Sequence, residues 1–312
     1  MLAGATLLAA TLAGAPAQAA SHPPKPSPND RPTVAKMAPK GKPGKLTRAL
    51  SPAGKLLAGP FYHYVGGRQL IAAPGYAGIT ANFWVGNPGI HTGSAPQDGG
   101  GTHSLAEIAV ESADQQQSVE VGWIKDPGIC AADPTNPCLF VGAWVNNVFQ
   151  GYNGGFVDYA PSTLDAGDSL ASYVGTAPAL EIQYFSGAWW VEAAGQWVGY
   201  FPGTLWSGVS PGFTAGRMFQ LFGEVASTET DGKPCSDMGT GDQGSSGGSG
   251  TSVARISSAT YIGSGGVLPS LTYFRSPTIA GYTNVTPSTR SFWYGGPGYN
   301  GAGTGVGTKG SC

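Results

Sequence analysis

The chain has 312 residues, of which only 11% are charged, while 51 are glycine and 25 are proline. Glycine and proline interrupt nearly every window of about fifteen residues, which excludes long helices over most of the sequence. Residues 20–60 carry a formal charge of +7 and residues 61–312 carry −9. The larger part is therefore acidic, which argues against nucleic acid as a partner. The 8 tryptophans and 13 tyrosines, together with few charges, indicate an all-β domain.

The first residues have the features of an export signal. An apolar run covers residues 2–12, and Ala17, Gln18 and Ala19 form a small-residue cleavage site before Ala20. This run is too short to cross a bilayer, and no later segment reaches about 18 apolar residues. We expect a signal peptide at 1–19 and a secreted, extracellular protein that does not enter a membrane.

Residues 20–58 are rich in proline and lysine and have almost no large apolar side chains. Such a segment cannot bury a core, and we expect a disordered or polyproline-like linker. Because it is basic and the domain at 59–312 is acidic, it could lie on that domain as a lid and be cleaved after its own prolines. A passive spacer is the alternative.

Four cysteines fit an oxidising compartment, and the sequence alone allows three pairings. The short separation of Cys130 and Cys138 favours one disulfide between them, which leaves Cys235 and Cys312 for a second. A zinc site is the rival interpretation. It is disfavoured because there is no CxxC spacing and no histidine lies near a cysteine, so we expect no metal.

Short apolar segments bounded by turn residues follow one another from residue 61 onward. The segments predicted as strands are 61–65, 79–85, 104–111, 118–125, 139–145, 151–160, 169–174, 179–185, 188–193, 197–201, 217–227, 252–261, 271–275 and 290–294, with one helical turn at 203–209. Segment 104–111 could also form a helical turn, but its alternation favours a strand that pairs with 118–125. Many short strands without helices predict a β-sandwich or a barrel. We favour an antiparallel β-sandwich with one concave face that carries the active site.

Two of these predicted strands each contain a glutamate that breaks an apolar pattern. Glu120 lies in QSVEVGWIK, and Glu224 lies in RMFQLFGEVAS. A carboxylate inside a sheet costs several kcal/mol unless it has partners or lines a cleft. A solvated, outward-facing glutamate is the ordinary alternative. Gly223, next to Glu224, suggests space for the backbone of a ligand.

Other catalytic patterns are weak. The GxSxG pattern occurs at 208–212 and 244–248, but neither copy lies between a strand and a helix. The four histidines have no metal-ligand spacing. His63 could lie near the site, although a surface histidine is the simpler interpretation.

The two glutamate motifs, VEVGW and FGEV, resemble those of the neprosin family of glutamic peptidases. Further landmarks agree in order: HYVG, GITANFWVGNP, SLAEIAVES, GAWWVE, WVGYFP and MGTG, with YGGPG near the C-terminus. The resemblance implies a β-sandwich catalytic domain and an endopeptidase that needs no metal or cofactor. It also implies cleavage on the carboxyl side of proline, at acid pH, with Glu120 and Glu224 as the catalytic residues.

Two carboxylates that share one proton can activate water and protonate the leaving nitrogen, which is what amide hydrolysis requires. We expect Glu120 and Glu224 on adjacent strands. A proline ring suits an aromatic wall beside them, and Trp123, Tyr184, Trp190 and Trp206 are the candidates. We expect a monomer that acts on proline-containing peptides or proteins. The alternatives are a glycosidase, and a carbohydrate-binding module in which Trp189 and Trp190 form a stacking surface.

Overall fold

The structure, a computed structural model, describes residues 61–90, 102–126, 128–210, 212–227, 234–248, 251–275 and 281–298, and the backbone of 32–33. The expected signal peptide lies outside the described residues, and so does the expected linker apart from Pro32 and Thr33. No helix in the described ranges is long and apolar enough to span a membrane.

The described residues form strands and three short 3-10 helices, and no α-helix occurs among them. The strands are β1 (Pro32–Thr33), β2 (Phe61–Leu70), β3 (Gly78–Phe83), β4 (His103–Glu111), β5 (Ser118–Lys125), β6 (Cys138–Val145), β7 (Val148–Phe149), β8 (Phe156–Asp158), β9 (Ala179–Phe185), β10 (Ala188–Ala193), β11 (Gln196–Pro202), β12 (Met218–Ser227), β13 (Arg255–Ile262), β14 (Thr272–Arg275), β15 (Thr283–Ser288) and β16 (Ser291–Gly295). The 3-10 helices are η1 (Ala171–Tyr173), η2 (Gly203–Trp206) and η3 (Gly244–Ser246).

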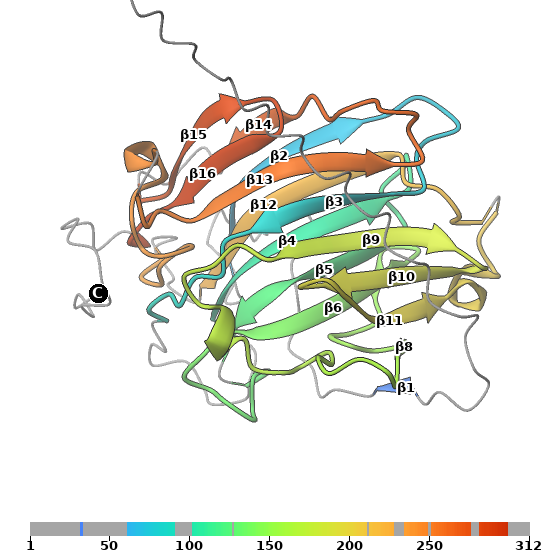
Figure 1. Cartoon of the computed structure of the whole chain (residues 1–312), viewed down its shortest axis with the longest axis horizontal. Helices are drawn as coiled ribbons and strands as arrows, with labels where there is room; N and C mark the ends of the chain where they lie inside the picture. Colours follow the sequence, from blue (N-terminus) through green and yellow to red (C-terminus); the bar gives the residue numbers. More distant parts are fainter. Residues whose placement is uncertain are drawn as a thin grey trace, which may run out of the picture.

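Two antiparallel sheets face each other, as Figure 1 shows, and the predicted β-sandwich is confirmed. The nine-stranded sheet has the order β1-β8-β11-β10-β9-β3-β13-β16-β15, and the seven-stranded sheet has the order β14-β2-β12-β4-β5-β6-β7. Strand β4 lies at the centre of the seven-stranded sheet, between β5 and β12. The strands of both glutamate motifs are therefore interior strands.

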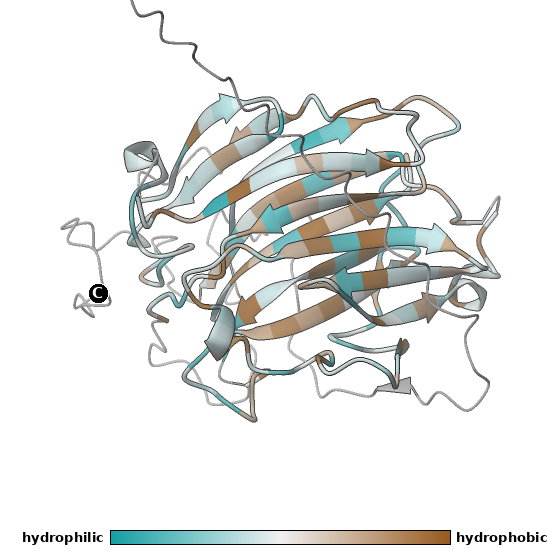
Figure 2. Ribbon diagram, in the orientation of Figure 1, coloured by the Kyte–Doolittle hydropathy of each residue, from teal (hydrophilic) through white to brown (hydrophobic). Residues whose placement is uncertain are grey.

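The main hydrophobic core lies between the sheets. Strand β4 sends Ala106, Ile108 and Val110 into it, and β12 sends Phe219 and Leu221. Alternate residues of the same strands point to the opposite face of the seven-stranded sheet, because side chains alternate along a strand. Hydrophobic and hydrophilic bands also alternate along strands such as β9 (Figure 2). The period of two that predicted these strands thus also separates the two faces of each sheet.

Several local predictions differ from the structure, and of the predicted strand 151–160 only Phe156–Asp158 is a strand. Residues 169–174 form no strand but contain η1, because Leu170 is their one buried side chain and a strand needs a buried face. Strand β2 continues to Leu70 because Gly66 lets it pass close to β12: a Cβ there would lie 2.3 Å from Cβ of Phe222. Strand β15 was missed, since it contains Pro287 and lies at a sheet edge, where proline is tolerated.

Two residues of the expected disordered linker are paired in the structure. Pro32 and Thr33 lie opposite Val157 and Phe156 of β8, at the edge of the nine-stranded sheet.

Candidate active site

Four glutamates point to the outer face of the seven-stranded sheet, the face turned away from the core. Glu107 and Glu111 lie on β4, Glu120 on β5 and Glu224 on β12. Residues paired directly across two strands share a face. Glu224 is paired with Leu105, and Glu120 with Ala109, and both partners lie on the outer face. We call this outer face of the seven-stranded sheet the carboxylate face.

Glu120 and Glu224 share the carboxylate face, but their predicted position on adjacent strands is wrong. Strand β4 runs between them, and their partners on β4 are four residues apart. Glu107 occupies the place between the two, because it is paired with Phe222 on one side and with Gly122 on the other. It is therefore a diagonal neighbour of both glutamates, at a backbone separation of about 7–8 Å that two glutamate side chains can span.

All four glutamate side chains are 0% exposed. Glycines on the neighbouring strands make room for two of them: a Cβ on Gly122 would lie 2.8 Å from Cβ of Glu107, and one on Gly142 would lie 3.0 Å from Oε2 of Glu120. Gly223 does not have the predicted role, because it faces the core. A Cβ there would lie 2.5 Å from the ring of Tyr294, so the space beside it is filled by the other sheet.

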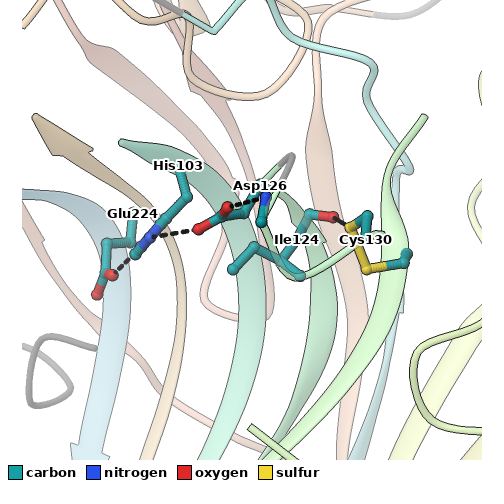
Figure 3. A network of polar contacts seen from close by, with 7 residues as sticks. His103, Ile124, Asp126, Cys130 and Glu224 are labelled. Atoms are coloured by element: carbon teal, nitrogen blue, oxygen red, sulfur yellow. Dashed lines mark hydrogen bonds and ion pairs between the residues drawn. A yellow bond between two sulfur atoms is a disulfide. The ribbon is translucent and has the colours of Figure 1, made fainter. Parts of the chain in front are cut away.

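Glu224 is held by a histidine and a tyrosine. Its Oε1 lies 2.7 Å from Nε2 of His103, and the hydroxyl of Tyr64 donates a hydrogen bond to its carboxylate. Its Oε2 is buried and has no hydrogen-bond partner among the residues that the structure describes. Figure 3 shows the imidazole of His103 between Glu224 and Asp126, whose Oδ2 lies 3.9 Å from Nδ1 of the ring. One oxygen of Glu224 is thus fixed, and the other is a buried acceptor without a partner among the described residues.

Glu120 has a different environment. The hydroxyl of Ser118, on the same strand and face, lies 3.3 Å from its Oε1. A Cβ on Gly142 would contact both Glu120 and the ring of Phe149, so this ring lies close to the carboxylate. Farther along the same face, the side-chain amide of Gln220 donates a hydrogen bond to Oε1 of Glu111.

Burial and neighbouring charge change the acidity of the phenols and the aspartate around Glu224. Burial, and then the charge of Glu224, raise the pKa values of Tyr64 and Tyr152 well above the ordinary value, so both hydroxyls stay neutral. Burial also raises the pKa of Asp126, and His103 together with backbone N–H donors opposes this effect. The site therefore consists of carboxyl groups, neutral hydroxyls and one imidazole.

A second pair of carboxylates lies on the nine-stranded sheet. Glu181 of β9 and Glu192 of β10 are direct cross-strand partners. Burial, and then the charge of Glu192, raise the pKa of Glu181 to about 7. Both side chains are half-buried. This pair has the adjacent-strand arrangement that was predicted for Glu120 and Glu224.

None of the four predicted substrate-binding aromatic residues lies on the carboxylate face. Trp123 and Trp206 are buried in the core between the sheets, and Tyr184 packs against the same core. Trp190 belongs to a separate aromatic cluster that includes Tyr200 and Trp197. The carboxylate face instead carries Phe140, Phe149 and Tyr152.

The disulfide between Cys130 and Cys138 is confirmed. Cys235 is also disulfide-bonded, while Cys312 lies outside the described residues. In the described ranges, no group of three or more histidine, cysteine or acidic side chains could hold a metal ion.

Four residues of the site were not among those predicted from the sequence: His103, Glu107, Asp126 and Tyr152. The alternation of SLAEIAVE contained a signal for Glu107, since it puts Leu105, Glu107 and Glu111 on one face. His103 and Asp126 lie at strand ends, where no periodicity points to them. His63 is buried, not at the surface, and its ring lies near Ser227, whereas His103 is the histidine at the site.

A β-sandwich with buried carboxylates and an imidazole on one sheet has the acid–base groups of a hydrolase. The Neprosin family model matches residues 100–297, which is more than half of the chain. The chain therefore belongs to the neprosin family, a family of glutamic peptidases. No curated protein matches the sequence.

Solved structures with a related arrangement have low sequence identity to this chain. One is scytalido-glutamic peptidase with a peptide-based transition-state analog (11% identity, TM-score 0.37, 75% of this chain and 98% of that chain). Another is SCP-B, a member of the Eqolisin family, in complex with the tripeptide Ala-Ile-His (10%, 0.36, 75% and 98%). A carbohydrate-binding module from Bacillus subtilis is also similar (10%, 0.25, 59% and 88%).

Proposed function

We propose that this protein is a secreted endopeptidase that hydrolyses peptide bonds on the carboxyl side of proline at acid pH, with Glu120 and Glu224 as its catalytic residues. The observation that carries the proposal is the hydrogen bonding of the two carboxylate oxygens of Glu224. One carboxylate oxygen is held by His103, and the other is buried without a partner among the described residues, on the face that also carries Glu120. A general base needs this combination of a fixed orientation and a free acceptor.

The chemistry follows from the row of carboxyl groups. A water molecule attacks the scissile carbonyl carbon while its proton passes to Oε2 of Glu224. Glu120, protonated at the start, supplies a proton to the leaving nitrogen as the C–N bond breaks. After this step the proton taken from water is on Glu224, and Glu120 has lost its own. Glu107 is a diagonal neighbour of both glutamates, and exchange through it returns a proton to Glu120. Water is added across the peptide bond, and no proton is gained or lost.

Aromatic side chains on the carboxylate face support a preference for proline. Phe149 lies next to Glu120, and the ring of Tyr152 is packed edge-on against Phe140 and Phe149. A proline ring is apolar and has no N–H to satisfy, so an aromatic surface suits it. Trp123, Tyr184, Trp190 and Trp206 are not retained for this role.

Secretion is supported by the apolar run at 2–12 with its small-residue cleavage site, and by the Cys130–Cys138 disulfide. We retain a monomer that acts on peptides as part of the proposal.

Substitution of each glutamate by the isosteric glutamine tests the assignment. We expect Glu120→Gln and Glu224→Gln to lower kcat/KM on a proline-containing peptide at acid pH by about 10²- to 10⁴-fold, the range for loss of a general acid or base. Glu181→Gln is the matched control, because it removes a half-buried carboxylate from the other sheet. Wild-type turnover by either active-site variant, with its fold intact by circular dichroism, would contradict the assignment.

The same proteins separate the proposal from its alternatives. Paired peptides that differ only in proline or alanine before the cleaved bond measure specificity, and equal rates would remove the preference for proline. The Glu181–Glu192 pair is the arrangement that favours a glycosidase. Hydrolysis of a polysaccharide panel that is lost in Glu181→Gln and retained in Glu224→Gln would support that function instead.

A further inference from the structure

We propose that His103, with Asp126 behind it, is a positioning residue that orients Glu224 for reaction and places a cationic group beside it when the imidazole is protonated. The proposal rests on the proposed function, because it assigns how that same site is controlled. It concerns a residue that the two glutamate motifs do not contain.

The backbone brings the three side chains together from three strands. His103 is the first residue of β4 and is paired with Ala226, which makes it a diagonal neighbour of Glu224 on β12. On the other side of β4, Ser104 is paired with Lys125, and Asp126 follows directly. The imidazole therefore lies between the two carboxylates, as Figure 3 shows, with Nε2 2.7 Å from Glu224 and Nδ1 3.9 Å from Asp126.

Asp126 is held by the turn that it begins. Its Oδ1 accepts a hydrogen bond of 2.8 Å from the backbone N–H of Gly128, and its carbonyl oxygen accepts bonds from Ile129 and Cys130. The disulfide from Cys130 to Cys138 then ties this turn to the first residue of β6. The second oxygen, Oδ2, is buried and makes no hydrogen bond to the described residues, and it is the atom nearest to His103. Asp126 is thus fixed in place with a free acceptor directed at the imidazole.

The groups that surround Glu224 make the charge of His103 important. Tyr62 and Tyr64 approach from β2, Glu107 from β4, Asp126 from the end of β5, and Tyr152 from the segment after β7. The tyrosines are neutral, and the other groups are acids. Of these groups only His103 can carry a positive charge. An imidazolium has two N–H donors, one on each ring nitrogen. Its Nε2 is within hydrogen-bond distance of Glu224, and its Nδ1 lies at the ion-pair distance of 3.9 Å from Asp126, which is longer than a hydrogen bond.

A positive charge on an imidazole in contact with a carboxylate favours the form of the carboxylate that accepts a proton from water, and the 2.7 Å contact puts His103 in the place from which it can act on Glu224 in this way. This effect matters most at acid pH, where carboxylates are otherwise lost to protonation. The hydrogen bond to Oε1 also turns the free Oε2 away from His103. His103 therefore acts through Glu224 and does not itself transfer a proton to the substrate.

His103→Gln tests the proposal, because the amide can still donate a hydrogen bond to Glu224 but carries no charge. We expect kcat at acid pH to fall roughly tenfold to a hundredfold, as for loss of one charge-assisted hydrogen bond, with KM little changed. The acid limb of the pH–rate profile should move to higher pH. Asp126→Asn should move it in the same direction by a smaller amount, and Glu192→Gln should leave it in place. A His103→Gln profile that superimposes on the wild-type profile would overturn the proposal.

A measurement without substrate separates this proposal from the proposed function. Nitrogen chemical shifts of the histidine side chains, followed against pH, report the charge of His103, and His63 is an internal control on the opposite face of the same sheet. We expect Glu224→Gln to shift the titration of His103 to lower pH and to leave His63 unchanged. If Glu224→Gln shifts His103 but retains activity, the proposed function fails and the coupling of the two side chains stands. If the titration of His103 does not respond, the positioning role is wrong, whatever the activity.

Discussion

Glycines at single positions decide where carboxylates fit on the central sheet. Gly122 lies opposite Glu107 and Gly142 lies opposite Glu120, so the residue beside each carboxyl group has no side chain. At Gly122 the space is limited further by the backbone, because a Cβ would lie 2.2 Å from the carbonyl oxygen of Ala106. The VEVGW motif thus supplies one catalytic candidate, Glu120, and also the gap that receives Glu107 of the next strand.

The substitution Gly122→Ala tests this role. The added methyl group would meet backbone that cannot move without separating β4 from β5, and we expect a loss of about 1–3 kcal/mol in the free energy of unfolding. Gly208→Ala is the matched control, since a Cβ there meets nothing within 4 Å. Urea denaturation measures both variants, and equal stability of the two would show that the close approach at Gly122 has no energetic consequence.

At the scale of elements, a short segment after β6 covers part of the carboxylate face. Residues 148–153 run along the free edge of β6: the N–H of Asn153 donates to the carbonyl of Val141, and its Oδ1 accepts from the N–H of Val141 at 3.1 Å. Phe149 lies near Glu120, and Tyr152 lies near Glu224 and Glu107. These glutamates are fully buried, and this segment, which we call the strap, contributes two of the aromatic rings that lie near them.

Asn153→Ala should loosen the strap. The substitution leaves the N–H of Val141 without its acceptor and puts alanine at a φ of 57°, where asparagine is better tolerated. We expect hydrogen exchange to become faster at the amides of 148–153 and to stay unchanged in β4. Gln150→Ala is the control within the strap, since the side-chain amide of Gln150 donates a hydrogen bond to the carbonyl oxygen of Val148 in the same segment and to no described residue outside the strap. Unchanged exchange in Asn153→Ala would mean that packing of the aromatic rings alone holds the strap.

At the scale of the whole molecule, buried titratable groups link stability to pH in opposite directions. Burial, and then the neighbouring Glu192, raise the pKa of Glu181 from 4.5 to about 7, so the folded protein binds this proton more tightly than the unfolded chain does. The stabilisation is complete below pH about 4.5 and is lost as the pH rises to about 7. Burial lowers the pKa of His63 from 6.5 to about 4, so folding disfavours its charged form. The contribution of neutral His63 to the free energy of unfolding is present above pH 6.5 and is lost as the pH drops to about 4.

Glu181→Gln separates these two effects. It removes the repulsion and the buried charge that the wild type carries above pH 7, and we expect the variant to be more stable there by roughly 1–3 kcal/mol. Below pH about 4.5 the two proteins should have nearly the same stability. Thermal or urea denaturation across pH 4–8, the window set by the ordinary and raised pKa of Glu181, measures the difference. A constant difference between variant and wild type over that window would contradict the linkage.

Much of the architecture follows from local pattern. The period of two in segments such as RMFQLFGEVAS is a property of neighbouring residues, and it placed β4, β5, β10 and β12 within a residue or two of their observed bounds. The same alternation identified Glu120 and Glu224 as acids that break apolar strands, and the proximity of Cys130 and Cys138 along the chain predicted their disulfide. Each of these inferences depends on residues close in sequence.

Only the tertiary structure decided which strands are neighbours. Insertion of β4 between β12 and β5 separates Glu120 from Glu224 and brings in Glu107, and it joins His103 to Asp126 and Glu224 across three strands. The packing of the two sheets also places Trp123 and Trp206 in the core, and the ring of Tyr294 fills the space beside Gly223. Strand order and register depend on how the two whole sheets pack. Alternation along one strand shows that the strand has two different faces, but it does not show which residues of other strands lie against each face.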